Sequence, residues 1–262
     1  MKTFGPLIIN IDNTKLSSSD RSIIGHELIG GVILFAHNYS SKQQLSILIN
    51  DLKSIKDNLL ITIDHEGGRV QRLINDFTHL PSFEYISKIK NKKLRYEAAY
   101  SAGYIAGYEL SEIGFDINFS PVVDVNHDKD NKLLKDRTFG NNIENVIKLA
   151  DQYIMGCLAG GILPVLKHYP GHGRVVTDSH VENCISNVTF DELMSTDIKP
   201  FQELIKNNHI PIMTNHVIYK EIDQYIATYS KKILQEQAKK IFSISNKMCF
   251  ISDDIEMYSA KF

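Results

Sequence analysis

The chain has 262 residues, of which 43% are hydrophobic and 23% charged, and its formal net charge is −2. This composition is typical of a globular protein, and the weak net charge disfavours nucleic acid as a partner. Three scattered cysteines without CxxC spacing disfavour a disulfide framework and a structural zinc site, and favour a reducing cytoplasm. The start lacks a secretory h-region, and no apolar run is long enough to span a membrane. We therefore expect one cytoplasmic domain over residues 1–262, without a membrane partner.

Short apolar, β-branched runs alternate with segments of helical periodicity along the chain. The expected strands lie at residues 7–11, 31–35, 59–63, 115–125, 162–166, 210–213 and 248–251. The expected helices lie at residues 45–55, 94–113, 146–158, 193–205 and 233–242, with Pro200 as a break in the fourth. Several strands are apolar on successive residues, as in parallel strands that are covered on both faces. This order predicts an α/β fold with a parallel sheet.

Polar residues follow the expected strands one after another. They are Asp64-His65-Glu66, Asp124, Lys167-His168, Asn215-His216 and Asp253-Asp254. In a closed barrel the C-terminal ends of the strands surround a single site, so each strand contributes a group. An open sheet instead binds its ligand at one switch point, which a Gly-rich loop often marks, and the sequence has no such loop. The pattern therefore predicts a TIM-type (β/α) barrel.

The densest polar segment reads Lys167-His168-Tyr169-Pro170-Gly171-His172-Gly173, followed by Thr177-Asp178-Ser179-His180. In an extended segment Asp178 and His180 share a face, so the carboxylate can orient the imidazole and raise its basicity. Such a histidine can donate a proton to a leaving oxygen and later take one from water. The alternative interpretations are a surface Asp–His contact and a solvated loop.

Asp253 and Asp254 come at the end of the last expected strand. Paired acids in that position are often caps of the following helix. A carboxylate can also capture the oxocarbenium-like state of glycoside cleavage covalently. Arg72 and Arg137 can bind hydroxyls or a carboxylate bidentately, although each alone is more often a surface ion pair. A sugar-cleaving hydrolase is the leading hypothesis.

Four segments occur in order: residues 64–72 (DHEGGRVQR), 167–173 (KHYPGHG), 178–180 (DSH) and 252–255 (SDDI). Together they closely resemble the family 3 glycoside hydrolases, specifically the cytoplasmic β-N-acetylglucosaminidases that recycle the bacterial cell wall. The resemblance covers nearly the whole chain. The KH-x-PGHG segment with the following DSH is highly specific, whereas the terminal SDD alone is not.

The resemblance implies retaining hydrolysis, in which Asp253 is the nucleophile and His180, paired with Asp178, is the acid/base. The sugar-contacting positions of the family match Asp64, Arg72, Arg137, Lys167 and His168. No metal or other cofactor is implied. The implied substrate is N-acetylglucosamine linked β-1,4 to anhydro-N-acetylmuramic acid in peptidoglycan-derived muropeptides, with or without peptide.

The chain departs from the family pattern at three places and at its end. His65 stands where the family usually has Gln, no glycine precedes residues 248–251, and Thr214-Asn215 replaces a common Pro-Ala. The chain stops at Phe262, nine residues after Asp253, where the family supplies another helix and an eighth strand. We therefore expect a barrel that lacks its last helix and strand, with uncovered sheet edges that favour self-association.

Two other hypotheses stay open. The first is a metal-dependent barrel hydrolase. It is suggested by ten histidines, of which His168, His172 and His180 lie close in sequence, although Lys167 beside them disfavours a cation. The second hypothesis, suggested by the position of the chain end, is a truncated relative that binds sugar without hydrolysing it. Metal analysis tests the first of these hypotheses, and calorimetry of sugar binding without hydrolysis tests the second.

Overall fold

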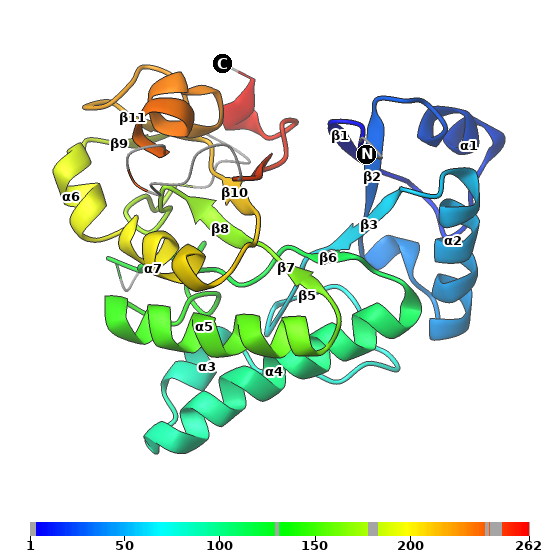
Figure 1. Ribbon diagram of the computed structural model, residues 1–262, viewed down its shortest axis with the longest axis horizontal. Coiled ribbons are helices and arrows are strands. Elements are labelled where there is room, and N and C mark those ends of the chain that lie inside the picture. The colour runs from blue at the N-terminus through cyan, green and yellow to red at the C-terminus, as the bar shows by residue number, and fades with distance from the viewer. Residues whose placement is uncertain (1–3, 129–130, 178–182, 239–240, 242–247, 262) are drawn as a thin grey trace.

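A computed structural model describes residues 4–128, 131–177, 183–238, 241 and 248–261 (Figure 1). One parallel sheet has the order β1 (Leu7–Asn10), β2 (Ile29–Leu34), β3 (Leu60–Ile63), β6 (Ile117–Asn118) and β7 (Leu163–Pro164). A second has the order β8 (Leu166–Tyr169), β10 (Ile212–Thr214) and β12 (Phe250–Ser252). Because only Val165 separates β7 from β8, the two sheets form one continuous parallel array. The predicted α/β fold with a parallel sheet is confirmed.

The strands follow one another in the array in chain order, as in a (β/α) barrel. Each neighbouring pair is parallel, and an isolated bridge from Val122 to Lys167 extends the contact between the β6 and β8 segments. Within the described residues, β1 and β12 each pair on one side only. The described part of the array therefore has two edges, at β1 and at β12.

The strands are apolar because the array is covered on both faces. Val32, Ile61 and Ile63 are fully buried on β2 and β3, and Leu166 is fully buried on β8. Burying such side chains contributes roughly 1.5–3 kcal/mol each relative to leaving them in water. This explains why continuous apolar runs predicted these strands correctly.

Helices cover the outer face of the array (Figure 1). They are α1 (Ser18–Ile24), α2 (Lys42–Ile55), α3 (Phe83–Ser87), α4 (Lys92–Ile113), α5 (Ile143–Ala159), α6 (Phe190–Ser195) and α7 (Lys199–Asn207). Successive long helices pack side by side: α2 on α4, α4 on α5, and α5 on α7. A π-helical segment, η3 (Lys232–Gln237), follows α7 and β10, and here Ser230 Oγ accepts the Ile233 N–H at 3.1 Å.

Helix ends lie where the sequence signals place them. Ser41 Oγ accepts the Gln44 N–H at 3.1 Å at the start of α2, and α4 ends at Gly114, whose φ is +108°. Only glycine adopts this left-handed conformation without strain. Pro200 lies in the first turn of α7, where its missing N–H costs nothing. The predicted helix at residues 193–205 is therefore two helices, as the proline indicated.

Helices α4 and α5 cross with their backbones almost in contact. A Cβ on Gly103 would lie 2.1 Å from the Tyr153 carbonyl oxygen, and one on Gly156 would lie 2.1 Å from that of Tyr100. No real side chain tolerates such a separation. The glycines therefore set the helix–helix distance, because the carbonyl of the facing helix occupies the space of the missing side chain.

One expected strand is shorter than predicted. Residues 115–125 contain only β6 and the single bridge at Val122, where the sequence pattern predicted eleven continuous residues. Pro121 lies between the two parts, and proline has no N–H to donate to a ladder. The Val123 N–H then donates to the Lys167 carbonyl at 2.9 Å, so the chain rejoins the array.

Two small sheets were not predicted. Strands β4 (His65–Gly67) and β5 (Val70–Gln71) form a hairpin, and β9 (Cys184–Ser186) pairs in parallel with β11 (Val217–Tyr219). β4 follows β3, and β11 follows β10, in both cases after the main strand has ended. Both small sheets therefore lie beyond the carboxyl ends of the array.

Candidate active site

The carboxyl ends of four strands bring charged side chains together. Asp64 directly follows β3, Lys167 and His168 lie in β8, and Asp253 directly follows β12. Asp124 follows the Val122 bridge. In a parallel array these ends share one edge, so residues distant in sequence meet there. The sequence prediction that the strand ends deliver polar groups to one place is therefore correct for these residues.

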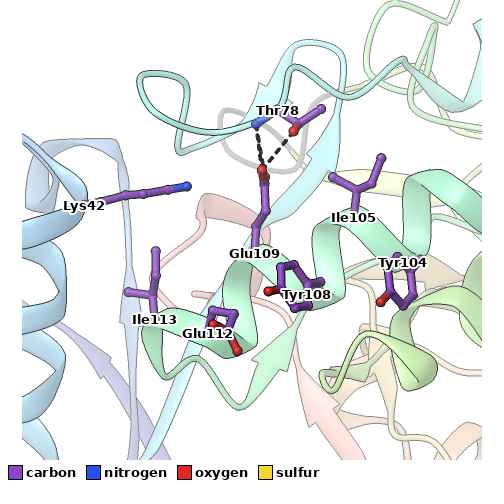
Figure 2. A pocket seen from close by; sticks show the side chains of 8 residues that line it. All are labelled: Lys42, Thr78, Tyr104, Ile105, Tyr108, Glu109, Glu112 and Ile113. Carbon is purple, nitrogen blue, oxygen red and sulfur yellow. Dashed lines mark hydrogen bonds between the residues drawn. The ribbon is translucent and has the colours of Figure 1, made fainter.

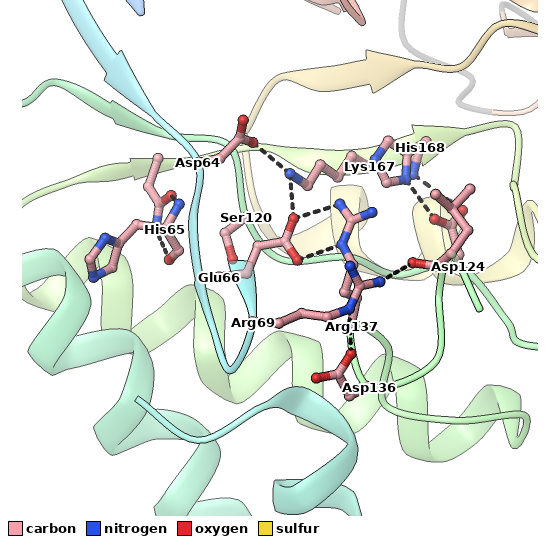
Figure 3. A network of polar contacts seen from close by, with 12 residues as sticks. Asp64, His65, Glu66, Arg69, Ser120, Asp124, Asp136, Arg137, Lys167 and His168 are labelled. Carbon is pink, nitrogen blue, oxygen red and sulfur yellow. Dashed lines mark hydrogen bonds and ion pairs between the residues drawn. The ribbon is translucent and has the colours of Figure 1, made fainter. Parts of the chain in front are cut away.

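A buried lysine lies at the centre of this edge (Figure 3). Lys167 Nζ donates to Asp64 Oδ1 at 2.8 Å and lies 2.7 Å from Glu66 Oε1. Lys167 is 2% exposed. Burial alone lowers its pKa, but the two carboxylates outweigh burial and hold that pKa above its ordinary value. The ammonium is therefore charged at neutral pH.

Glu66 joins this lysine to Arg137. Arg137 donates from Nε to Glu66 Oε2 at 2.9 Å and from Nη2 to Oε1 at 2.7 Å, a bidentate arrangement. Burial raises the pKa of the Glu66 carboxyl, but Arg137 and Lys167 lower it more strongly, so the net shift is downward. Glu66 was not predicted as a site residue. Its position two residues beyond Asp64, after the same strand, was the signal for it.

Asp64 and Arg72 are the partly open members of the cluster. The Asp64 side chain is 19% exposed and that of Arg72 is 33% exposed. Arg72 Nη2 lies 3.6 Å from Asp64 Oδ2, and its guanidinium lies 5.5 Å from the centre of the Phe35 ring. Asp64 and Arg72 therefore offer partly exposed carboxylate oxygens and guanidinium donors, which suits hydrogen bonding to the hydroxyls of a sugar.

His168 is held by a second buried carboxylate. Asp124 is fully buried, and its Oδ2 accepts from His168 Nδ1 at 2.7 Å. Asp124 Oδ1 accepts the backbone N–H of His172 at 2.7 Å. The His172 ring is 4% exposed, packs edge-on against His168, and neither of its nitrogens has a partner among the described residues. Burial lowers the pKa of His172 to about 4, so this ring is neutral at pH 7.

Asp253 is the carboxylate on the last described strand. It is half-buried, its N–H donates to the Thr214 carbonyl at 3.1 Å, and its Oδ1 accepts the Asp254 N–H at 2.9 Å. Burial raises its pKa. Attraction to His168 lowers it, as do the hydrogen bond from the Asp254 N–H and attraction to His216 and Lys167, and together these effects outweigh burial. The net shift of the Asp253 pKa is downward. The carboxylate is therefore ionised at neutral pH, as a nucleophile requires.

The other two predicted catalytic residues, Asp178 and His180, lie outside the described residues. The segment is described up to Thr177 and again from Asn183. At its near end, Asn131 Nδ2 donates to the Val175 carbonyl at 3.0 Å. At its far end, Cys184 begins β9 and pairs with Val217. The proposed roles of Asp178 and His180 therefore stay predictions.

His65, where the sequence departs from the family pattern, points away from the charged cluster (Figure 3). Its N–H donates to Asn118 Oδ1 at 2.9 Å, and its ring packs 6.2 Å from that of Phe77. Burial, followed by repulsion from Arg72, lowers the pKa of this ring to about 4. The departure therefore affects the packing behind the site. It leaves the contacts of Lys167 unchanged.

A separate hollow of about 380 Å³ lies on the outer wall, between α2, α4 and the loop at Thr78 (Figure 2). Its lining includes Tyr104, Tyr108 and Glu109, and Glu109 accepts from both the backbone and the hydroxyl of Thr78. None of the predicted site residues lines it.

Among the described residues, no three His, Cys, Asp or Glu side chains gather as metal ligands. No helix within the described residues has the length and apolarity to cross a membrane.

Comparisons with known proteins identify the family of this chain. Residues 6–261 match the model of the glycosyl hydrolase family 3 N terminal domain. The β-hexosaminidase of Psychromonas ingrahamii is 36% identical over 259 residues, which cover 98% of this chain and 76% of that protein. The β-hexosaminidase of Nitrosomonas eutropha is 37% identical over 260 residues, which cover 98% and 74%. NagZ from Neisseria gonorrhoeae, solved in complex with N-trifluoroacetyl-D-glucosamine, has 32% identity and a TM-score of 0.91, covering 96% of this chain and 75% of that chain.

Proposed function

Because the chain belongs to glycosyl hydrolase family 3, as a β-hexosaminidase of that family, we propose that it removes terminal β-linked N-acetylglucosamine from peptidoglycan-derived muropeptides. The observation that carries the proposal is the position of Asp253 directly after β12, at the edge to which β8 brings Lys167 and His168. Attraction to His168 and Lys167 helps to hold the pKa of its carboxyl below the ordinary value. We also propose that the reaction retains the anomeric configuration and takes place in the cytoplasm.

The proposed mechanism has two steps. In the first, the Asp253 carboxylate attacks the anomeric carbon, the glycosidic bond breaks, and His180 gives its proton to the leaving oxygen. In the second, His180 takes a proton from water, and that water displaces Asp253 from the sugar, so the enzyme returns to its first state. Asp178 would orient His180 and stabilise its protonated form. These roles of His180 and Asp178 rest on the sequence motif.

The proposed sugar-binding residues are the five that match the sugar-contacting positions of the family: Asp64, Arg72, Arg137, Lys167 and His168. Asp64 would accept hydrogen bonds from sugar hydroxyls, and Arg72 and Lys167 would donate to them. His168 would contact the same ring. Arg137 uses its Nε and Nη2 on Glu66, which leaves Nη1 for the sugar. The N-trifluoroacetyl-D-glucosamine bound to the gonococcal NagZ supports an N-acetylated sugar in this site.

An aryl β-N-acetylglucosaminide tests the glycosidase activity, and N-acetylglucosaminyl-anhydro-N-acetylmuramic acid tests the narrower substrate. We expect the chain to release aryl alcohol from the first and N-acetylglucosamine from the second. Proton NMR of the sugar formed first should show the β-anomer. An α-anomer would contradict the retaining mechanism, and hydrolysis of the aryl glycoside alone would contradict the muropeptide substrate.

Asp253→Asn should abolish this turnover, and Asp254→Asn is the matched control. The Asp254 side chain is exposed and accepts the Glu256 N–H, and only its backbone N–H contacts Asp253. We expect Asp254→Asn to retain most of the activity. Undiminished turnover by Asp253→Asn would refute the nucleophile. Sugar binding without any hydrolysis by the unmodified chain would instead favour a non-catalytic sugar-binding protein.

A further inference from the structure

Asp124 takes no part in the proposed mechanism, yet it is built into the site. Its side chain is fully buried, so it does not reach a bound sugar. Among the described residues, its side-chain hydrogen bonds go to the segment that carries Lys167 and His168. Oδ2 accepts from His168 Nδ1 at 2.7 Å, and Oδ1 accepts the backbone N–H groups of His168 at 3.2 Å and His172 at 2.7 Å.

The charge on Asp124 decides the direction of these hydrogen bonds. Burial raises the pKa of the carboxyl, but His168 and the His172 backbone outweigh burial, and the net shift is downward. An ionised carboxylate only accepts hydrogen bonds. The hydrogen between Asp124 and His168 therefore belongs to the imidazole, on Nδ1.

A neutral imidazole carries one hydrogen, so a hydrogen on Nδ1 leaves a lone pair on Nε2. Nε2 lies on the side of the ring away from Asp124, and 9% of the His168 side chain is exposed. The neighbouring Lys167 has only donors to offer. Together the two side chains present an acceptor and a donor to whatever binds beside them.

We propose that Asp124 is a positioning residue that fixes His168 in its Nδ1–H tautomer, so that Nε2 accepts a hydrogen bond from one hydroxyl of the bound sugar. The sugar part of this inference rests on the proposed function. A buried acceptor discriminates strongly against a ligand without the matching hydroxyl, because the acceptor then stays unpaired. Asp124 would thus contribute to substrate specificity without touching the substrate.

Nitrogen-15 NMR of the imidazole side chains tests the tautomer without substrate. We expect the neutral His168 ring to carry its hydrogen on Nδ1, with the signals assigned by their loss in His168→Gln. In Asp124→Asn, the amide NH₂ group faces His168 Nδ1 and donates to it, so the hydrogen should move to Nε2. Asp116→Asn is the matched control, because Asp116 binds Lys53 and the Ile61 N–H outside this site.

Two outcomes would overturn the tautomer assignment: a hydrogen on Nε2 in the unmodified protein, or an unchanged tautomer in Asp124→Asn. If Asp124→Asn does not fold, the spectrum of the unmodified protein still shows which nitrogen of His168 carries the hydrogen. The result is independent of turnover. A chain that hydrolysed no aryl glycoside would therefore disprove the proposed function while the tautomer was still measured.

Deoxy substrates test the hydroxyl contact. We expect Asp124→Asn to lower kcat/KM for an aryl β-N-acetylglucosaminide by roughly 10- to 100-fold, the usual range for a lost buried hydrogen bond. The same substitution should cost much less on whichever of the 3-, 4- or 6-deoxy analogues lacks the hydroxyl that donates to His168. An equal loss on all three analogues would show that Asp124 acts through the fold alone.

Discussion

Glu66 Oε1 lies 2.7 Å from Lys167 Nζ, and neither side chain is more than 2% exposed. The same oxygen lies 2.7 Å from Arg137 Nη2, so one carboxylate balances two buried cations. Glu66→Gln would leave Arg137 without its charged partner and Lys167 with Asp64 alone. Because breaking a buried ion pair costs roughly 3–5 kcal/mol, we expect the free energy of unfolding in urea to fall by about that amount.

Glu112→Gln is the control for this substitution. Glu112 lines the outer hollow (Figure 2), which none of the proposed site residues lines, and we expect the stability and the kcat/KM of this variant to match those of the unmodified protein. Equal stability of Glu66→Gln and Glu112→Gln would mean that the buried cations find other partners when Glu66 loses its charge.

Asp253 should not limit activity at mildly acidic pH. Its folded-state pKa lies below the ordinary aspartate value of 3.8, so it stays ionised as the pH falls to that value. An aryl glycoside with a strongly acidic phenol as leaving group needs no proton donor. We therefore expect that in a His168→Gln background, where protonation of the His168 acceptor plays no part, kcat/KM for this substrate stays constant from pH 7 to about pH 4.5.

An aryl glycoside with a weakly acidic phenol is the comparison. Its kcat/KM depends on a proton donor, so we expect it to fall as the pH rises and the donor loses its proton. For the activated substrate, an acid limb well above the ordinary aspartate pKa that persists in His168→Gln would contradict Asp253 as the attacking group.

His65 should make the protein less stable in acid. Its pKa is about 4 in the folded state against 6.5 for a free histidine. Between these values the unfolded chain binds a proton that the folded chain does not, so stability falls as the pH drops below 6.5. Each pH unit in this window is worth about 1.4 kcal/mol, or roughly 2–3 kcal/mol between pH 6.5 and 4.5. We expect His65→Gln to remove this loss, measured by urea denaturation at both pH values.

His79→Gln serves as the control, because His79 lies nearby in sequence and is exposed. It should leave the difference in stability between the two pH values unchanged. His172, which is buried and neutral in the same way, should continue to destabilise the His65→Gln variant in acid. An identical pH dependence in His65→Gln and the unmodified protein would contradict the burial argument.

Gly156→Ala should destabilise the crossing of α4 and α5. The new Cβ would lie 2.1 Å from the Tyr100 carbonyl oxygen, so the helices must move apart and lose packing. Overpacking of this kind costs roughly 1–3 kcal/mol, which thermal unfolding would detect. Gly25→Ala is the control, since Gly25 has φ −64° and its nearest neighbour would be 3.3 Å away. Equal melting temperatures for the two variants would show that the helices separate without cost.

Local patterns predicted seven strands, and the expected strand at residues 162–166 covers both β7 and the start of β8. They succeeded because strands buried on both faces require continuous apolar runs. They did not predict β4–β5 or β9–β11, in which each strand has only two or three residues. Strands β6 and β7 are equally short but lie within apolar runs, whereas β4, β5 and β9 include polar residues and gave no such run. The interruption of the expected strand at residues 115–125 could have been predicted from Pro121, which has no N–H to donate. The apolar residues on both sides of Pro121 nevertheless favoured one continuous strand.

The sequence indicated that several polar residues meet at one edge of the array, but it did not indicate the network that they form. Asp64 and Lys167 could be assigned to one edge because both come at strand ends. Their contact spans 103 positions in the sequence, and nothing local indicates that Glu66 rather than a sugar engages Arg137. Asp124 was recognised as a polar residue after an expected strand. Its hydrogen bonds with His168, however, depend on the path of the chain after Val122.

The single N–H that Asp254 gives to Oδ1 makes the two oxygens of Asp253 chemically different. Oδ1 already shares a lone pair, so Oδ2 is the more basic oxygen and the one that would bond to carbon in the proposed reaction. Oδ1 then becomes the carbonyl oxygen of an ester and keeps its donor. The donor that favours ionisation before attack would afterwards withdraw electrons from the ester and help water release the sugar.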